Sequence, residues 1–489
     1  MTPRVASVTE IDKLAQTVTW NKLADENFDY INKRAYFDYQ ISRVFVRTSK
    51  LLRRHSTGAL RKRTWKNREI RATHHVEITA SKCPFCKSKD LIAIPVKQRP
   101  KGVQTKHKRA FDIVVTPGVV KRKVIDVRAT AYRCSRCDRC FVSDRYHRLA
   151  KHYHGFMSWF AYQQITHRLG VKTLAGLFHE TFGIRVNWWE FLDFRNLLAR
   201  YYRNTYRRLL ARIVAGPVLH VDETEVKLRT GTGYVWVFAD VETAAYVFRP
   251  TREGGFLREM LKGFNGVLVS DFYSAYDGLD CLQQRCLIHL IRDMNRAILD
   301  NPFDHELQSI TASFGVLLRS IVTTVDEHGL KRRYLERHNR AVETFFDDLT
   351  EHSYESDASK ALQERLIRNR DRLFTFLHHD GISWNNNVAE NAIRRFSYYR
   401  EDVGRSIKER GLVEHLELLS LYQTCRVRGI SFLKFLLSRE RNLDAFSESR
   451  RQRYRAARVE LYPKGYLPPS LITLRRGKRR ESAIDDAVE

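Results

Sequence analysis

Short apolar runs alternate with turn residues between positions 206 and 300. The runs that predict strands are Val218–Val221, Val226–Leu228, Tyr234–Ala239, Ala245–Phe248 and Val267–Val269. Gly231-Thr232-Gly233 predicts a turn between two of these strands, and a helix is expected over Phe256–Lys262 before the last one. Strands joined first by hairpins and then by a helix are typical of a mixed α/β sheet.

From about residue 301 to 380 the apolar positions change to helical spacing. The recurring residues are Leu307, Ile310, Phe314, Leu317, Ile321, Leu335, Val342 and Phe346. Gly381 ends this run, and helices are expected again from Asn386 to about Leu437. The pattern predicts a helical insertion within the α/β region.

A second helical stretch is expected over residues 152–202, with breaks at Gly170 and Gly183. Its last two pieces span residues 173–182 and 188–201. A short glycine-containing turn joins them, which is typical of a helix-turn-helix and equally of a helical hairpin that only packs. Trp188 and Trp189 are expected in the core rather than at base edges.

The charge balance points to the kind of partner. The 489 residues include 86 Lys and Arg against 56 Asp and Glu, so the formal net charge is +30. Such an excess favours a polyanionic partner, and nucleic acid is the natural one, although a membrane surface would also attract the chain and a generic basic enzyme is the plain alternative. No segment approaches the roughly 20 apolar residues of a spanning helix, and the N-terminus lacks a signal-peptide pattern. We therefore expect a cytoplasmic, nucleoid-associated protein with no membrane partner.

Basic residues concentrate near both ends. Arg43, Arg47, Lys50 and Arg54 recur at helical spacing within residues 1–80. That stripe is either a solvated face or an arm that follows the DNA backbone. The tail carries a further cluster, at Arg475, Arg476, Lys478, Arg479 and Arg480.

Five of the eight cysteines lie between Cys83 and Cys140, which predicts a metal site rather than disulfides. Cys83 and Cys86 form one Cys-x-x-Cys pair, and Cys134 and Cys137 form a second. Two such pairs supply four thiolates to a structural Zn²⁺, and the strand-like flanks predict a zinc ribbon with an extended hairpin. Cys140 leaves an ambiguity, because Cys137 and Cys140 have the same spacing.

Two predicted strands lead directly into aspartates. Asp222 follows Val218–Val221, and Asp271 follows Val267–Val269. Neighbouring strands would bring the two carboxylates together, and carboxylates that repel one another are held by a hard cation such as Mg²⁺ or Mn²⁺. Each aspartate alone carries little weight, since Asp is common in turns.

A third carboxylate stands in the segment Asn386-Asn387-Val388-Ala389-Glu390. Asn386 or Asn387 can cap a helix, which puts Glu390 in its first turn. Arg394 lies four residues further, where it would steady the carboxylate or grip a phosphate. By itself the segment is also compatible with an ordinary capped helix that carries a surface ion pair.

Three local motifs resemble the DDE transposases of bacterial and archaeal insertion sequences. They are Val221-Asp222-Glu223-Thr224, Cys286-x-x-His289-x-x-Arg292, and Asn386-Asn387-x-x-Glu390-x-x-x-Arg394. The resemblance covers roughly residues 215–435 and implies an RNase H-like mixed-sheet core with a catalytic triad of Asp222, Asp271 and Glu390. It assigns the metal-binding role to Asp222 rather than to the nearby Glu223 or Glu225. His289, Arg292, Asn387 and Arg394 are then supporting residues, and the cysteine-rich part resembles the zinc ribbon and helix-turn-helix modules that precede such cores.

With this resemblance the chain divides into seven predicted regions. They are a basic helical region (1–80), a zinc ribbon (81–147), a helix-turn-helix region (148–205), the first part of the core (206–300), the helical insertion (301–380), the second part of the core (381–440) and a basic tail (441–489).

The implied chemistry is in-line displacement at phosphorus with two divalent metal ions. Water as nucleophile cleaves the element ends, and a freed 3′-hydroxyl as nucleophile transfers the strand into target DNA. His289 and Arg292, three residues apart on one helix face, contact a phosphate or support the metal site, or are a core histidine and a surface arginine. We expect a homo-oligomer on double-stranded DNA. The alternatives are an RNase H-like nuclease without strand transfer and a catalytically retired DNA-binding regulator.

Overall fold

The computed structural model describes residues 70–116, 118–403 and 407–446. The predicted basic stripe near Arg43 and the cluster after Arg475 lie outside these ranges, so both stay predictions. Within them the chain is a mixed α/β protein with helices and mixed sheets, which is the coarse part of the predicted fold class. No helix in these ranges is long and apolar enough to span a bilayer.

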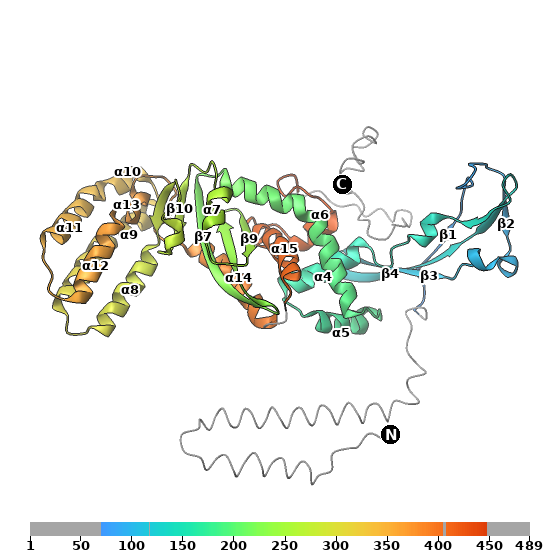
Figure 1. The fold of residues 1–489 in the computed structure, drawn as a ribbon, viewed down its shortest axis with the longest axis horizontal. Helices are drawn as coiled ribbons and strands as arrows, with labels where there is room; N and C mark the ends of the chain where they lie inside the picture. Colours follow the sequence, from blue (N-terminus) through green and yellow to red (C-terminus); the bar gives the residue numbers. More distant parts are fainter. Residues whose placement is uncertain (1–69, 117, 404–406, 447–489) are drawn as a thin grey trace, which may run out of the picture. The chain divides into compact units, whose positions relative to one another are not determined.

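Two small sheets form the N-terminal part of the described chain (Figure 1). One has the order β1-β4-β3, with β1 (His74–Ile78), β4 (Val119–Ala129) and β3 (Lys108–Thr116); the other has the order β2-β5-β6, with β2 (Leu91–Ile94), β5 (Ala131–Cys134) and β6 (Cys140–Val142). Short helical turns are η3 (Val96–Gln98), η4 (Lys101–Val103) and α3 (Asp144–His147). β3 and β4 pair antiparallel along their length, which is the extended hairpin expected between the cysteine pairs.

Three helices follow: α4 (His154–Thr166), α5 (Val171–Phe182) and α6 (Trp188–Val214). Gly183 ends α5 in the left-handed region with φ of 65°, where its N–H donates to the His179 carbonyl. Asn187 and Glu190 form a capping box that starts α6. The predicted breaks at Gly170 and Gly183 are therefore correct, although α6 runs well past the predicted end, to Val214.

The expectation that Trp188 and Trp189 are core residues is wrong. Their exposed fractions are 49% and 52%. Both lie in the first turn of α6, whose buried face is made by Phe191, Phe194 and Leu198 at spacings of three and four residues. The two indoles fall outside that stripe and face away from it.

A five-stranded sheet forms the centre of the chain, in the order β11-β10-β7-β8-β9 (Figure 1). Its strands are β7 (Val218–Leu228), β8 (Gly231–Ala239), β9 (Ala244–Arg249), β10 (Val267–Ser270) and β11 (Leu282–Arg285), with α7 (Gly255–Met260) and η5 (Ser274–Tyr276) in the connections. β7, β8 and β9 are antiparallel neighbours, whereas β10 is parallel to both β7 and β11.

The two faces of the sheet carry different neighbours, because side chains alternate along each strand. Leu219, Val221 and Leu268 pack with the end of α6 and with α7 in one core cluster. Val218, Val267 and Val269 belong to a second cluster on the opposite face. Asp222 and Asp271 follow at alternate positions after Val218 and after Val267 and Val269, so their side chains are on the same face as this second cluster.

Two later helices hold the sheet at β7 and β9: α14 (Asn387–Val403) and α15 (Glu409–Val427). The Tyr246 hydroxyl on β9 donates to the Ala392 carbonyl of α14 at 2.7 Å. The Ser420 and Thr424 hydroxyls of α15 accept from the backbone N–H groups of Tyr246 and Ala244 at 3.0 and 3.2 Å. α15 thereby covers the open edge of β9, where unpaired N–H groups would otherwise stand. The short α16 (Phe432–Ser438) follows.

Helices occupy most of the region predicted as an insertion, residues 301–380, as its apolar spacing indicated. α8 (Leu287–Asp300) precedes this region, whose elements are α9 (His305–His328), α10 (Arg332–Leu335), η6 (Glu336–His338), α11 (Asn339–Glu351), α12 (Asp357–Arg368), α13 (Arg370–Leu373) and η7 (Thr375–Leu377). Val342 is partly buried, and the other residues expected at helical spacing are buried. They share one cluster with Val267 and Val269 of the sheet, so the insertion packs directly on the face that carries Asp222.

Candidate functional site

Asp222 and Asp271 meet through the register of two parallel strands. Val267 pairs with Val218 and Val269 pairs with His220. Continuing the same register by two positions along both segments places Asp271 opposite Asp222. Both side chains are then on the face of the sheet that α14 and the insertion cover. Asp271 directly follows β10, as predicted.

Asp222 does not end its strand, which corrects the expectation drawn from the sequence. β7 continues to Leu228 because it pairs with β8 along its whole length. On its other side, the pairing with β10 stops at His220. Asp222 therefore lies where its parallel neighbour ends, and this opens one side of the strand to ligands.

The surroundings of Asp222 disfavour its charged form. Burial, followed by the neighbouring carboxylates of Glu223 and Asp271, raises the pKa of Asp222 to about 7. Glu390 raises it further. Several carboxylates thus crowd a partly buried place, and a cation bound between them would relieve the repulsion.

Glu223 points away from this face. Its side chain is only 2% exposed, forms an ion pair with Arg252 at 2.6 Å, and accepts a hydrogen bond from the Tyr276 hydroxyl at 2.7 Å. Alternation along β7 puts Glu223 on the side opposite Asp222. Its carboxylate is already satisfied, so Asp222 is the better metal ligand of the two.

Glu390 enters from the first turn of α14. His289 Nδ1 lies 3.6 Å from Glu390 Oε1, and Arg292 Nη2 lies 3.8 Å from Glu390 Oε2. His289 Nδ1 and Glu390 Oε1 are both buried and neither has a hydrogen-bond partner. A cation or a polar ligand would satisfy the Glu390 oxygen.

The three acidic side chains lie toward one face of the sheet, but their carboxylate oxygens do not converge on one position. Among the described residues, two sets of three or more possible ligands have all their ligand atoms within 4.8 Å of one another. One is the four-cysteine cluster, and the other joins Cys286, His289 and Glu390. The Asp222, Asp271 and Glu390 carboxylates do not form such a set.

Asn386 attaches the Glu390 helix to the Asp222 strand. Its side-chain amide donates to the Val221 carbonyl at 2.8 Å, and its side-chain oxygen accepts from His220 Nδ1 at 3.1 Å. Asn386 is fully buried. The sequence suggested a capping role for this residue, but the hydrogen bonds of its side chain go to β7 instead.

Cys286 joins the remaining segments of the site. Its N–H donates to the Ser270 carbonyl at 2.8 Å, and its sulfur accepts from the Asn386 N–H at 3.2 Å. The next residue, Leu287, donates its N–H to the Trp384 carbonyl at 3.0 Å. The end of β10 and the starts of α8 and α14 therefore converge on this cysteine.

Arg285 is a positioning residue that sequence reasoning missed. Only 1% exposed, it donates from Nη1 to the Ser270 hydroxyl and to the Asp271 carbonyl, both at 2.7 Å, and it forms an ion pair with Asp277. It holds the backbone that carries the Asp271 carboxylate. No strand was predicted over Leu282–Arg285, so nothing in the sequence singled out this arginine.

Two of the predicted supporting residues stand apart from the three carboxylates. Asn387 is exposed, and its backbone N–H donates to the Asn385 side-chain oxygen at 3.1 Å. Arg394 is also exposed and has no ion pair with Glu390 among the described residues. His289 and Arg292, by contrast, face Glu390.

The four predicted zinc ligands come together in the N-terminal part. Cys83 and Cys137 have their sulfurs 3.7 Å apart, and Cys86 and Cys134 have theirs 3.5 Å apart. Cys140 lies on β6 outside this cluster, paired with Arg133 across the sheet. The structure thus favours Cys134 and Cys137 as the second pair.

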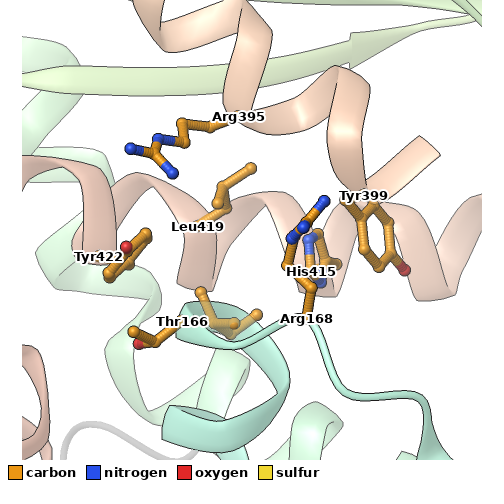
Figure 2. A pocket seen from close by; sticks show the side chains of 8 residues that line it. Thr166, Arg168, Arg395, Tyr399, His415, Leu419 and Tyr422 are labelled. Atoms are coloured by element: carbon orange, nitrogen blue, oxygen red, sulfur yellow. The ribbon is translucent and has the colours of Figure 1, made fainter. Parts of the chain in front are cut away.

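A small pocket lies between α4, α14 and α15, and Figure 2 shows the side chains around it, His415 and Tyr399 among them. These two rings stack with their centroids 3.5 Å apart. The volume is about 10 Å³, enough for roughly one water molecule. This pocket belongs to the packing of the helices and is too small for a substrate.

Comparison with known proteins adds a family. Residues 152–413 match the model described as the transposase IS66 family. The chain is also 25% identical over 259 residues to a protein of Sinorhizobium fredii (strain NBRC 101917 / NGR234) described as "Uncharacterized protein y4qI". That alignment covers 47% of this chain and 48% of the relative, so the chain spans about half the length of the curated relative it matches. The family match includes all three carboxylates and excludes the cysteine cluster.

Proposed function

This chain belongs to the transposase IS66 family, and from that premise we propose that it cuts DNA at the ends of an insertion sequence and joins them to target DNA. The observation that carries this proposal is the approach of Asp222, Asp271 and Glu390 on one face of the central sheet. Because the partner is DNA, the net charge of +30 is in keeping with the proposal.

We assign the central sheet to the RNase H-like class. Three antiparallel strands, β7 to β9, are followed by β10 and β11, which add in parallel on the other side of β7. This order supports the assignment, since it puts the first and fourth strands side by side and their aspartates in register. The regions predicted around the sheet, from the zinc ribbon to the second part of the core, are proposed with it.

The carboxylates of Asp222, Asp271 and Glu390 would hold two Mg²⁺ or Mn²⁺ ions. The donor set fits, because it consists of hard oxygens, the pKa of Asp222 is raised to about 7 by burial and its acidic neighbours, and Glu390 Oε1 is buried without a partner. The ions supply activation of the attacking oxygen and stabilisation of the leaving oxygen at phosphorus.

The other residues of the site orient this donor set. Asn386 ties the Glu390 helix to β7, and Arg285 holds the backbone at Asp271. His289 and Arg292 lie within 4 Å of Glu390, where they restrain its carboxylate, and Arg292 offers positive charge to a phosphate.

The four-cysteine cluster is proposed to hold a structural Zn²⁺. Four thiolates leave no open coordination position, so this site would shape a DNA-binding lobe rather than catalyse. α5 and α6 are proposed to form a helix-turn-helix on that DNA, and the exposed indoles of Trp188 and Trp189 support contact with a ligand. We propose a homo-oligomer on DNA in the cytoplasm.

The test uses Asp271→Ala and a labelled duplex that carries the ends of the element. We expect Mg²⁺- or Mn²⁺-dependent cleavage to fall by at least about a thousandfold while DNA affinity stays within about twofold, since the carboxylate acts on the metal ions and not on DNA binding. Asp280→Ala is the matched control, because Asp280 is exposed and lies outside the site. Wild-type cleavage by the Asp271 variant would refute the assignment.

The same assay separates the two rivals. A nuclease without strand transfer would release cut ends and never join a labelled 3′-end to target DNA. A retired regulator would bind the duplex and leave it intact with either metal. The presence of all three carboxylates favours an active enzyme over the retired form.

A further inference from the structure

A second hollow, separate from the three carboxylates, lies beside the Glu390 helix. It has a volume of about 580 Å³ and is bounded by α14, the C-terminal half of α15 and the turn between β8 and β9. Its polar lining consists of Asp240, Asn391, Arg394, Arg395, Gln423 and Arg426, together with the phenol of Tyr398. This volume is large enough for a phosphate with its sugar, unlike the cavity of Figure 2.

The lining is strongly positive. Arg394, Arg395 and Arg426 have no ion-pair partner within residues 70–116, 118–403 and 407–446. Asp240 is the one acid on the wall, and its Oδ1 already accepts the backbone N–H groups of Glu242 and Thr243 at 2.7 and 2.6 Å. Three guanidinium groups around one concavity repel one another unless an anion lies between them.

Gln423 adds an unsatisfied acceptor to the wall of the hollow. The residue is 4% exposed and lines the hollow, and its side-chain oxygen is buried without a hydrogen-bond partner. A buried amide oxygen left unbonded costs free energy, and because a phosphodiester has no hydrogen-bond donor, a water that bridges this oxygen to a phosphate oxygen would recover it. Tyr398, which also lines the hollow, is 37% exposed, and the Arg168 guanidinium lies over its ring at 5.1 Å from the centroid.

Arg395 is held in place by the packing of the helices. Its side chain lines both this hollow and the small cavity between α4, α14 and α15, where Figure 2 shows it near Leu419 and Tyr422. A guanidinium supported on one side and open on the other loses less conformational entropy on binding than a free surface arginine. A solvated basic face, the ordinary explanation for such a cluster, would be convex and would lack the buried amide.

We propose that this arginine-lined hollow binds the phosphodiester backbone of a DNA strand that leaves the cleavage site along α14. Arginine is suited to this role, because its planar fork matches phosphate oxygens in two parallel hydrogen bonds. The inference rests on the proposed function in one respect only, namely that DNA is the substrate. Arg394, which is too far from Glu390 for an ion pair, thereby acquires a role at the DNA backbone.

The test measures DNA binding without added Mg²⁺ or Mn²⁺ and without a chelator, so that the outcome is independent of catalysis and the cysteine cluster keeps its zinc. The probe is a fluorescein-labelled duplex of random sequence, titrated by fluorescence anisotropy at several salt concentrations between about 50 and 200 mM. The double variant Arg394→Gln/Arg426→Gln is compared with wild type and with Arg319→Gln. Arg319 is an exposed arginine of α9 without an ion pair among the described residues.

For two lost phosphate contacts, the slope of log K against log salt is expected to become shallower by about 2, and affinity at low salt to fall about tenfold or more. Arg319→Gln should leave the slope nearly unchanged. An unchanged slope in the double variant would overturn the proposal. So would a change half as large in the control, which removes one charge rather than two, because DNA would then be sensing only net charge.

A second measurement uses the unaltered protein. Modification by phenylglyoxal, read by peptide mass spectrometry, should be slowed at Arg394, Arg395 and Arg426 by duplex DNA and much less by inorganic phosphate at the same phosphate concentration. Equal protection by both would assign the hollow to a free anion and reject a DNA strand. The cleavage test of Asp271→Ala and the binding tests of the hollow have separate outcomes. If Asp271→Ala still cleaves DNA, only the catalytic assignment is rejected. If it loses cleavage, the assignment of the hollow still depends on the slope and protection measurements alone.

Discussion

Asn386 offers a sharp test of how the helix that carries Glu390 is held. Replacement by Ala removes the hydrogen bond to the Val221 carbonyl and the one from His220 Nδ1, which are 2.8 and 3.1 Å long and buried. Each partner left unsatisfied costs about 1–3 kcal/mol, so Asn386→Ala should lower the free energy of unfolding by about 3 kcal/mol. The neighbour Asn387 is exposed, and Asn387→Ala should cost less than about 0.5 kcal/mol.

Urea denaturation and hydrogen–deuterium exchange together measure this effect. A loss of about 3 kcal/mol corresponds to about a hundredfold, since each 1.4 kcal/mol is a factor of ten. Exchange should therefore accelerate by about a hundredfold in peptides of β7 and α14, where the contact opens locally. Peptides of the N-terminal sheets serve as the internal control. Metal-dependent cleavage should fall with the loss of Glu390 positioning, while DNA binding persists. Equal losses in Asn386→Ala and Asn387→Ala would refute the argument, since it depends on the difference in burial between the two amides.

Three further predictions concern the rest of the chain. Cys137→Ser should release zinc in metal analysis and loosen the N-terminal sheets, whereas Cys140→Ser should keep full occupancy. Burial lowers the pKa of His154 to about 3, so the contribution of the neutral imidazole to stability is complete above pH 6.5 and is lost as pH falls. Between pH 7 and pH 5 the free energy of unfolding of wild type, measured by urea denaturation, should therefore fall by about 2 kcal/mol more than that of His154→Gln. Gly155→Ala should cost about 3 kcal/mol in thermal unfolding, because its Cβ would lie 2.2 Å from a carbonyl oxygen of β3, whereas the open Gly176 should gain about 0.5–1 kcal/mol on the same change.

The sequence predicted those features that depend on residues close to one another along the chain. The spacing of two cysteine pairs anticipated a four-sulfur cluster, because short turns bring both members of each pair to one point. Apolar periodicity anticipated the helices of the insertion and their buried faces, since a helix repeats its contacts every turn. Gly183 marked the end of α5 for a similarly local reason, its backbone at φ 65°.

The arrangement of the site depended on contacts between distant segments. Whether Asp222 ends a strand depended on how far β8 and β10 pair with β7, and no local pattern carries that information. Trp188 and Trp189 face away from the core because α5 and α4 cover a different side of α6, although two adjacent indoles suggested burial.

The three carboxylates show most clearly which features the sequence determines and which depend on the tertiary structure. The sequence alone determined which residue types stand after Val218–Val221 and Val267–Val269 and in the first turn of the helix after Asn386. Only the tertiary structure decided that Asn386 joins that helix to β7 and that Cys286 joins it to β10, across separations of 165 and 100 residues. Such contacts form when buried polar groups of distant segments satisfy one another, and that condition is a property of the whole fold rather than of any one segment.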